Sequence, residues 1–282
     1  MNTSIASLQK QSSLKNITLK ESKEKLTAFI LAGERPHVID PVAAAGGVML
    51  KALLPIAGVP MLLRVITSLR AVPAIGQIVV CASRPELLKK IVSDDILLIP
   101  AQDDGPSASV LDGLKRFGTP LLVTTADNAL LQPQWSREFL NDAMTPQNDI
   151  AAAVALKACI QRDVPSTKRT YIHLTDMVFS GCNLFLFQTP ISAQVATLWR
   201  VVEKNRKNPL RIAWTLGPIT FLRAALGLLS SQALYKHIFI RTGARAKLIP
   251  LSDGRAAVDV DKPADIVLAE KIALTDFQQL SE

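Results

Sequence analysis

Three aspartates are the residues of this chain whose positions point most directly to chemistry. Asp127 follows an apolar run that begins at Leu121, and a run of this kind is typical of a buried parallel strand. Ligands of open α/β sheets bind where such strands end, and a carboxylate there suits Mg²⁺ bound to substrate phosphates. Asp259 and Asp261 share one face if their segment is extended. Asp261, with Asp259 in reserve, is a candidate second carboxylate for the same metal.

The same aspartates also have a purely structural interpretation. Asp and Asn often end a strand, so Asp127 and Asn128 would then mark only the turn that follows it. Asp261 lies just before Pro263, which is a normal start signal for a helix, so Asp261 would then be a cap. Both interpretations stay open at this point.

A phosphate-binding loop is expected near the beginning of the chain. Residues 27–32 predict a strand, and Gly33 follows it. Glycine at the end of a strand lets backbone amides approach an anion. Lys51 is the only Lys or Arg between Arg35 and Arg64. A lysine beside a glycine loop supplies a point charge for a phosphate.

Strands and helices alternate through the first half of the chain, which predicts a parallel sheet with right-handed crossovers. Ser83 is expected to cap the helix that Pro85 opens. The fold class is therefore α/β, with helices on both faces of a mostly parallel sheet. The expected strands are 27–32, 77–82, 96–99, 121–125 and 150–156, and the expected helices are 60–71, 85–90, 109–117 and 133–143.

The alternation breaks after Lys157, and the second half predicts a different organisation. Residues 191–245 are expected to form a helical insertion or an acceptor-side subdomain within one domain of residues 26–282. Residues 1–25 are rich in Ser, Lys, Gln and Asn, which predicts a disordered basic arm. Other expected elements are short strands at 171–175 and 184–187, a helix at 191–203, and a strand from residue 255 that leads into a closing helix at 264–274.

One stretch, residues 212–229, is almost wholly apolar and approaches the length of a membrane span. Its central Pro218 and Arg223 argue against a span, since an arginine there is costly. Two interpretations remain: a helix pair that packs on the domain or covers the acceptor pocket, or a peripheral contact with a membrane surface. Three cations that would suit an interfacial helix precede the stretch: Arg206, Lys207 and Arg211.

Composition narrows the class of protein. Of the 282 residues, 49% are hydrophobic and 20% charged, which favours a folded globule over disorder. The three cysteines form no Cys-x-x-Cys pair, so we expect neither a zinc site nor a disulfide framework, and we expect a reducing cytoplasm. The net charge of +8 suits phosphorylated small molecules or an anionic membrane. No basic patch is interleaved with aromatic residues, so a nucleic-acid partner is not expected.

Four stretches in this order resemble the MobA-like nucleotidyltransferases, the NTP-transferase branch of the GT-A fold. Relatives in this branch include molybdenum-cofactor guanylyltransferases and methylerythritol-phosphate cytidylyltransferases. The resemblance implies a three-layer, Rossmann-like fold and transfer of a nucleotide from an NTP to a phosphorylated small molecule, with Mg²⁺ as cofactor. The stretches are Leu31–Gly33, Lys51–Pro60, Thr125–Leu131 and Val258–Asp265.

The resemblance also implies roles for individual residues. Asp127 and Asp261 would bind Mg²⁺, while Lys51 and Arg35 would neutralise the triphosphate. Asn183 falls where relatives place acceptor-binding residues. The implied nucleotide-binding residues are Leu31, Ala32, Gly33, Glu34, Lys51, Gly105, Ser107 and Ser109.

One departure from the family pattern keeps other functions open. Glu34 stands where a second glycine is usual, and an anion beside a phosphate loop is unfavourable unless it points away. The first alternative is a nucleotide sensor or membrane-surface scaffold without catalysis. The second is a glycosyltransferase of the same architecture, although Asp127-Asn-Ala is not the Asp-x-Asp of many such enzymes.

Overall fold

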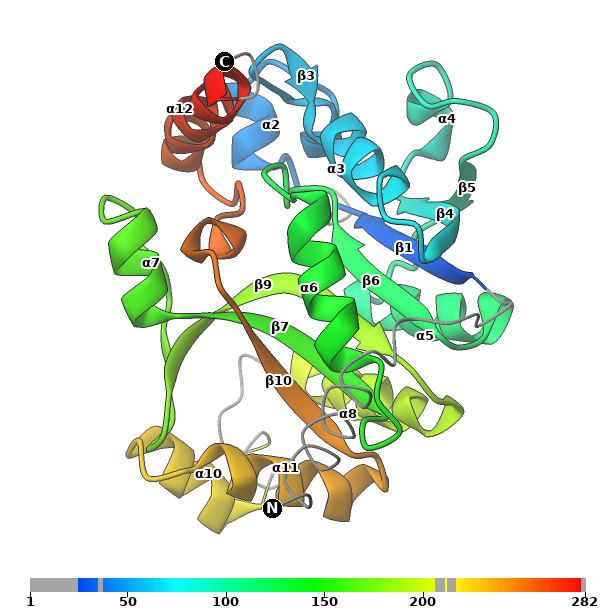
Figure 1. The fold of residues 1–282 in the computed structure, drawn as a ribbon. Coiled ribbons are helices and arrows are strands. Elements are labelled where there is room, and N and C mark those ends of the chain that lie inside the picture. Colours follow the sequence, from blue (N-terminus) through cyan, green and yellow to red (C-terminus); the bar gives the residue numbers. More distant parts are fainter. Residues whose placement is uncertain (1–24, 35–37, 206–210, 212–216, 280–282) are drawn as a thin grey trace, which may run out of the picture.

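A computed structural model describes residues 25–34, 38–205, 211 and 217–279 of the chain. Its main feature is one twisted sheet that runs through the molecule, with helices on both sides (Figure 1). The strand order is β10-β7-β9-β6-β1-β4-β5, and the short β8 pairs with β9. The strands are β1 (Leu26–Ala32), β4 (Ile75–Ala82), β5 (Leu97–Pro100), β6 (Leu121–Thr125), β7 (Ile150–Leu156), β8 (Ile172–His173), β9 (Val178–Phe187) and β10 (Ala246–Leu251).

Most neighbouring strands are parallel. Strand β9 is the exception, since it lies antiparallel between β6 and β7. A separate two-stranded hairpin joins β2 (Pro55–Ile56) to β3 (Val59–Pro60). The mostly parallel α/β sheet expected from the sequence is confirmed.

Two apolar cores lie on opposite faces of the sheet, as the side-chain alternation of β1 illustrates. Ala28 and Ile30 belong to the core under α3 and α6, whereas Phe29 belongs to the core under α5 and α8. All three side chains are fully buried, because a strand covered on both faces has no polar side. The fold therefore has three layers: helices, sheet and helices.

The helices that form the outer layers begin mostly at a proline, which suits the first turn of a helix. They are α2 (Pro41–Ala45), α3 (Met61–Arg70), α4 (Pro85–Leu88), α5 (Pro106–Phe117), α6 (Pro133–Ala143), α7 (Lys157–Asp163), α8 (Ala193–Lys204), α10 (Pro218–Ala225), α11 (Ser231–Thr242) and α12 (Pro263–Gln279). Short 3₁₀ turns are η1 (Lys51–Leu53), η2 (Pro190–Ser192) and η3 (Gly254–Ala257).

The carboxyl ends of β1 and β6 meet at one edge of the sheet, because these strands are parallel and adjacent. Leu31 of β1 is in register with Thr125 of β6, so Gly33 and Asp127 follow two neighbouring strand ends. The chain after η3 returns to the same edge, where the Val260 amide donates to the Asp127 carbonyl at 3.1 Å. The topology thus brings together three of the four stretches that carry the family resemblance.

Three local expectations were wrong. Residues 254–257 form η3 instead of a strand, and the strand that precedes the closing helix is β10. Pro60 lies in β3 and caps α3 instead of opening it. The Ser83 hydroxyl does not cap α4, because it bonds to the backbone of Glu34.

Helices α10 and α11 lie together at the end of the molecule opposite α2 and α12 (Figure 1). The Thr220 hydroxyl of α10 and His237 Nδ1 of α11 are 3.2 Å apart. These helices correspond to the second half of the apolar stretch and the residues after it, while residues 212–216 lie outside the described part. In that part of the chain, no helix has the length and apolar character needed to cross a membrane. The expected arm, residues 1–25, likewise lies almost entirely outside the described residues.

Candidate functional site

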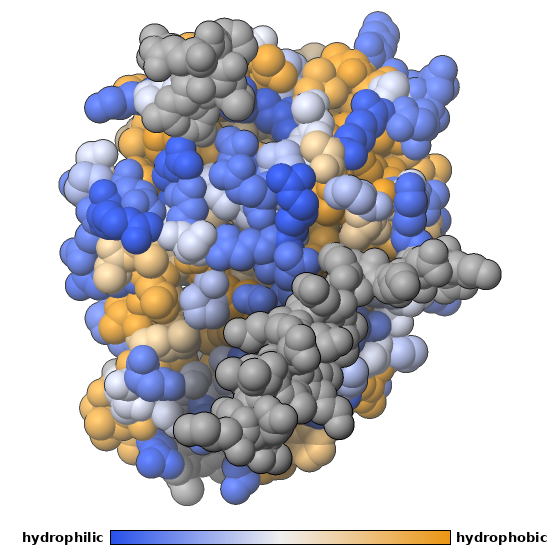
Figure 2. Space-filling view, viewed as in Figure 1, coloured by the Kyte–Doolittle hydropathy of each residue, from blue (hydrophilic) through white to orange (hydrophobic). Residues whose placement is uncertain are grey.

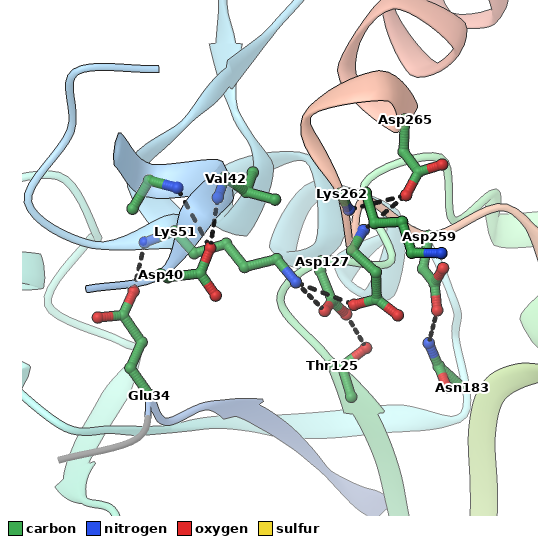
Figure 3. A network of polar contacts seen from close by, with 12 residues as sticks. Glu34, Asp40, Val42, Lys51, Thr125, Asp127, Asn183, Asp259, Lys262 and Asp265 are labelled. Atoms are coloured by element: carbon green, nitrogen blue, oxygen red, sulfur yellow. Dashed lines mark hydrogen bonds and ion pairs between the residues drawn. The ribbon is translucent and has the colours of Figure 1, made fainter. Parts of the chain in front are cut away.

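The centre of the site is an ammonium group held between two carboxylates (Figure 3). Lys51 Nζ lies 2.7 Å from Asp127 Oδ2 and 3.1 Å from Asp261 Oδ1. Lys51 and Asp127 are largely buried, whereas 58% of the Asp261 side chain is exposed. The structure therefore joins three residues that are 76 and 210 positions apart in the chain.

Asp127 is fixed by the strand that ends just before it. Thr125 Oγ1 donates to Asp127 Oδ1 at 2.5 Å, while Asp127 Oδ2 accepts from Lys51. The Asp127 carbonyl accepts from the Val260 amide. The purely structural interpretation, in which Asp127 only ends a strand, does not explain why both of its carboxylate oxygens accept hydrogen bonds.

Asp261 is positioned by the first turn of α12. The Asp265 carboxylate accepts from the amides of Asp261 and Lys262, at 3.1 Å and 2.8 Å. Asp265 thus satisfies the backbone donors at the start of α12, where such donors have no partner within the helix. The Asp261 carboxylate accepts from Lys51, and the Asp265 carboxylate accepts from the two amides that precede this helix.

The charges of this centre stabilise one another. Burial alone would lower the pKa of Lys51, but the negative charges of Asp127 and Asp261 and their hydrogen bonds raise it well above its usual value. Burial would likewise raise the pKa of Asp261, but the nearby Lys51 ammonium lowers it instead. Lys51 is therefore a permanent cation at neutral pH.

Glu34 is directed at the backbone of the lysine loop. Its Oε1 accepts from the Lys51 amide at 2.5 Å, and its own amide donates to Ser83 Oγ at 2.6 Å. One backbone amide of this loop therefore already has a side-chain carboxylate as its hydrogen-bond acceptor. Arg35, the other predicted cation of the loop, lies outside the described residues.

A cavity of about 690 Å³ opens beside the centre. Most of the predicted nucleotide-binding residues line it, and a second cavity of about 460 Å³ adjoins it at Ala32 and Lys51. Carboxylates outnumber cations in the lining of the first cavity, where Lys204 is the one described cation. Its predicted lining residues are Leu31, Gly33, Glu34, Gly105, Ser109, Asp127 and Asp261.

The far wall of the cavity joins the start of α5 to the end of α8. Gly105 caps α5 with φ of 105° and ψ of 178°, a conformation that glycine alone adopts readily. A Cβ atom there would lie 2.6 Å from Glu203 Oε1. Glu203 Oε2 accepts from the Ser107 amide at 3.2 Å, and Asp104 pairs with Lys204 at 3.0 Å. Ser107, a predicted nucleotide-binding residue, is fully buried and is not among the residues that line the cavity.

A second polar cluster lies beside the centre. Asp259 is buried and accepts from Arg169 Nη2 at 2.5 Å and from Asn183 Nδ2 at 2.7 Å. Burial raises the pKa of Asp259 against the opposing effect of Arg169. Asn183 has φ of 49°, the left-handed region that Asn tolerates better than most residues. Asp259 thus bonds to the predicted acceptor residue, and Asp261 bonds to Lys51.

Several residues of the site gave no sequence signal. Arg169 comes from a polar loop without periodicity, and Glu203 ends a predicted helix without any local motif. Glu203 reaches Ser107 across 96 positions, and Arg169 reaches Asp259 across 90. Only tertiary contacts of this range could reveal such residues.

The two carboxylates at Lys51 fit a magnesium ion. Mg²⁺ usually takes one or two protein carboxylates and completes its coordination with water and substrate phosphates. Asp127 Oδ2 and Asp261 Oδ1 both lie within 3.1 Å of one cationic atom, so one metal ion could reach both. Within the described ranges, no group of three or more His, Cys, Asp or Glu side chains is arranged to hold a metal. The metal would therefore have to bind jointly with a phosphate-bearing substrate.

Comparisons with known proteins identify the family and the fold of this chain. The sequence model of the family described as the MobA-like NTP transferase domain matches residues 28–200. A structure described as a hypothetical transferase from Thermus thermophilus is similar, with 27% identity and a TM-score of 0.72, over 86% of this chain and 100% of the other. A comparison with curated protein sequences gave no match.

Two more distant structures share the fold. One is a CMP:2-keto-3-deoxy-manno-octonic acid synthetase in complex with CTP, with 12% identity and a TM-score of 0.57, over 90% of this chain and 100% of the other. The second is a 4-diphosphocytidyl-2C-methyl-D-erythritol synthase from Anaerococcus prevotii, with 12% identity and a TM-score of 0.52, over 89% and 99% of the two chains. The family match covers more than half of the chain, and the chain belongs to the MobA-like NTP transferase family.

Proposed function

We propose that this protein is a Mg²⁺-dependent nucleotidyltransferase that moves an NMP group from an NTP to a phosphorylated small molecule. The observation that carries this proposal is the Lys51 ammonium between the carboxylates of Asp127 and Asp261 at the mouth of a 690 Å³ cavity. A phosphate oxygen of the acceptor would attack the α-phosphorus of the NTP. The bond from that phosphorus to the β-phosphate oxygen would break, and pyrophosphate would leave.

The reaction needs charge neutralisation and alignment more than proton transfer. An acceptor phosphate is ionised at neutral pH, so no general base is required. Lys51 would hold the triphosphate with a fixed positive charge. Gly33, which has no side chain, would let the phosphates approach the backbone amides closely. Mg²⁺, held by Asp127 and Asp261, would neutralise the charge that develops on the departing phosphates.

The acidic cavity supports a metal-loaded nucleotide as the donor. A bare triphosphate would meet more carboxylates than cations in this lining, whereas a divalent cation reverses the local balance. The synthetase that was solved with CTP shares this fold, which supports a nucleotide in the cavity. Ser109 and Gly105, on the wall made by α5, would contact the base or ribose.

The acceptor would lie on the side of the Asp259 cluster. Asn183 and Arg169 would present an amide and a guanidinium to its phosphate, with Asp259 holding both side chains in place. We further propose that residues 26–282 form one domain and that residues 191–245 are an insertion whose α8 closes the nucleotide side of the cavity. The three cysteines of the chain are free, which supports a cytoplasmic reaction.

A thermal-shift screen tests the donor half of this proposal. We expect one of CTP, GTP, ATP and UTP to raise the melting temperature of the wild-type protein in the presence of Mg²⁺, and not after chelation. The reason is that a ligand that binds the native state and not the unfolded state stabilises the native state. In Asp127→Ala the Mg²⁺-dependent shift should disappear, because one of the two metal-binding carboxylates is removed.

The matched control is Asp94→Ala, which removes an exposed carboxylate remote from the cavity lining. This variant should keep the full shift. A shift that does not depend on Mg²⁺, or that survives in Asp127→Ala, would contradict the proposed metal site. A Mg²⁺-dependent shift without turnover on any phosphorylated acceptor would favour a nucleotide sensor.

A further inference from the structure

The segment that contains α10 and α11 is strongly basic. Arg223, Lys236 and Arg241 lie in these two helices, whereas Lys204 lines the cavity and Arg245 pairs with Asp149. Residues 204–252 contain nine of the 32 Lys and Arg residues of the chain and none of its 24 Asp and Glu residues. This segment alone therefore accounts for the positive net charge of +8. A strongly basic segment without acidic residues attracts an anionic surface.

The same helices expose large apolar side chains. Leu222 of α10 and Leu226, the residue that caps the end of this helix, are one turn apart, and Leu228 follows them. Phe239 and Ile240 lie in α11. Each of the five side chains is more than half exposed. Exposed apolar side chains that lie one turn apart, as Leu222 and Leu226 do, favour an interaction surface, whereas single exposed ones need no explanation.

Cations are interleaved with these apolar groups. Arg223 is exposed beside Leu222, and Lys236 is exposed one turn before Phe239 and Ile240 on the same face of α11. Figure 2 shows apolar and polar side chains mixed at the lower left of the molecule, where Figure 1 draws α10. We define the basic apolar surface as Leu222, Arg223, Leu226, Leu228, Lys236, Phe239 and Ile240.

We propose that the basic apolar surface docks the protein on an anionic phospholipid membrane. Leucine, isoleucine and phenylalanine would enter the boundary between headgroups and acyl chains, while Arg223 and Lys236 would contact lipid phosphates. A nucleic acid would use the cations but leave the aliphatic side chains exposed to water. The contact is peripheral, because no described helix can cross a membrane.

The position of the surface is compatible with catalysis on the membrane. Helices α10 and α11 lie at the end of the molecule opposite α2 and α12, which flank the loop of Lys51 (Figure 1). Docking would therefore leave the cavity at Asp127 open to soluble substrates. The inference rests on the charge and exposure of α10 and α11 and does not depend on the proposed reaction.

Vesicle flotation tests the docking. We expect the full-length protein to float with phosphatidylcholine vesicles that contain roughly 30% phosphatidylserine, and not with pure phosphatidylcholine vesicles. The bound fraction should fall at about 0.5 M salt, where surface charges are screened. Leu226→Gln/Ile240→Gln should reduce binding about tenfold, and Arg223→Gln/Lys236→Gln should remove its dependence on anionic lipid.

Two matched controls change the same kinds of residue elsewhere. Val267→Gln replaces an exposed apolar residue of α12, and Lys89→Gln/Lys90→Gln replaces two exposed cations. Both should float like the wild type, and all variants should keep its melting temperature. The proposal is overturned if the wild type does not float, or if the surface variants float as well as the controls. It is also overturned if the surface variants lose only self-association or nucleic-acid binding.

Discussion

Lys51 connects the charged residues of the candidate site. Its Nζ holds Asp127 and Asp261 together, while its amide is bonded to Glu34. The departure of Glu34 from the family pattern thus has a local explanation, since its carboxylate accepts from this amide beside the predicted phosphate loop. Because the Lys51 amide is bonded to Glu34, the group that would meet a phosphate is the Lys51 ammonium, which pairs with Asp127 and Asp261 in this structure.

Gly105 offers a test of the cavity wall at the scale of one residue. Gly105→Ala should destabilise the fold by roughly 1–3 kcal/mol, because its backbone conformation strains any residue with a Cβ atom. It should also weaken NTP binding, since the new methyl group would displace Glu203 from the start of α5. Urea unfolding and nucleotide titration measure the two effects separately.

Gly118→Ala is the matched control for this substitution. Gly118 has φ of 73°, but a Cβ atom there would meet nothing within 4 Å. It should lose stability through strain and keep the wild-type nucleotide affinity. Equal affinities for the Gly105→Ala and Gly118→Ala proteins would show that the wall at Glu203 does not shape nucleotide binding.

Much of the candidate site could be predicted from the sequence, because Asp127 follows a recognisable strand, Lys51 follows a glycine loop and Asp261 precedes a helix that begins at a proline. Lys51, Asp127 and Asp261 were expected to act together, and the structure brings them within hydrogen-bonding distance. The partners Arg169 and Glu203 could not be predicted, since neither lies in a motif. Their roles arise from packing between distant segments.

At the scale of elements, Asp149 joins the ends of three strands. It precedes β7, and its carboxylate accepts from the amide and guanidinium of Arg245, which precedes β10. It also accepts from the hydroxyl of Thr189, just after β9, at 2.8 Å. The charged hydrogen bonds of Arg245 lower the pKa of the Asp149 carboxyl well below its usual value, against the opposing effect of burial.

Asp149→Asn should therefore destabilise the sheet in a pH-dependent way. At pH 7 we expect a loss of roughly 1.5–3 kcal/mol in the free energy of unfolding, because the hydrogen bonds to a charged acceptor are weakened. Because the pKa of Asp149 is lower in the folded state, its ionisation stabilises the fold at pH values above its unfolded-state pKa of about 4. This contribution disappears as the pH falls toward the pKa of the folded state. The difference between wild type and variant should thus shrink in acid.

Urea unfolding at a series of pH values measures this difference. The exposed Asp94→Asn variant is the control and should stay within about 0.5 kcal/mol of the wild type throughout. A difference for Asp149→Asn that is constant from pH 7 to about pH 3 would contradict the assigned role of its charge.

The first half of the fold was more predictable than the second. Strands β1, β4, β6 and β7 each contain an apolar run, and α6 was expected with its observed bounds, Pro133–Ala143. The reversal of β9 could not be predicted, because an antiparallel strand buried on both faces is as apolar as a parallel one. Strand β10 contains Pro250, and a proline is tolerated in a strand at the edge of the sheet.

At the scale of the whole molecule, the chain separates two kinds of surface. The acidic cavity lies at the carboxyl ends of β1 and β6, where the sheet topology predicts a ligand. The basic apolar surface lies on α10 and α11 at the opposite end (Figure 1). A protein that docks through one end and binds nucleotide at the other could act on soluble substrates beside a membrane.

The whole-molecule architecture was predictable as a family fold, and its C-terminal helices were not. Residues 28–200 match the family, and most of α10 and α11 lies beyond them. Their sequence is apolar and basic without a clear helical period, so it was compatible with both a packed helix pair and a membrane contact. The structure supports the helix pair and adds the exposure of its apolar side chains.

The most direct test of the nucleotidyl-transfer site follows the α-phosphate of the donor. The protein is incubated with Mg²⁺, each NTP labelled at the α-phosphate, and a panel of phosphorylated sugars and alcohols, and labelled products and pyrophosphate are quantified. We predict that label moves to one acceptor with an equal amount of pyrophosphate. Asp127→Ala and Asp261→Asn should reduce this transfer by at least about a hundredfold, and Asp94→Ala should leave it unchanged. Full activity in Asp127→Ala, or release of nucleoside diphosphate from nucleotide sugars in place of pyrophosphate from NTP, would contradict the account.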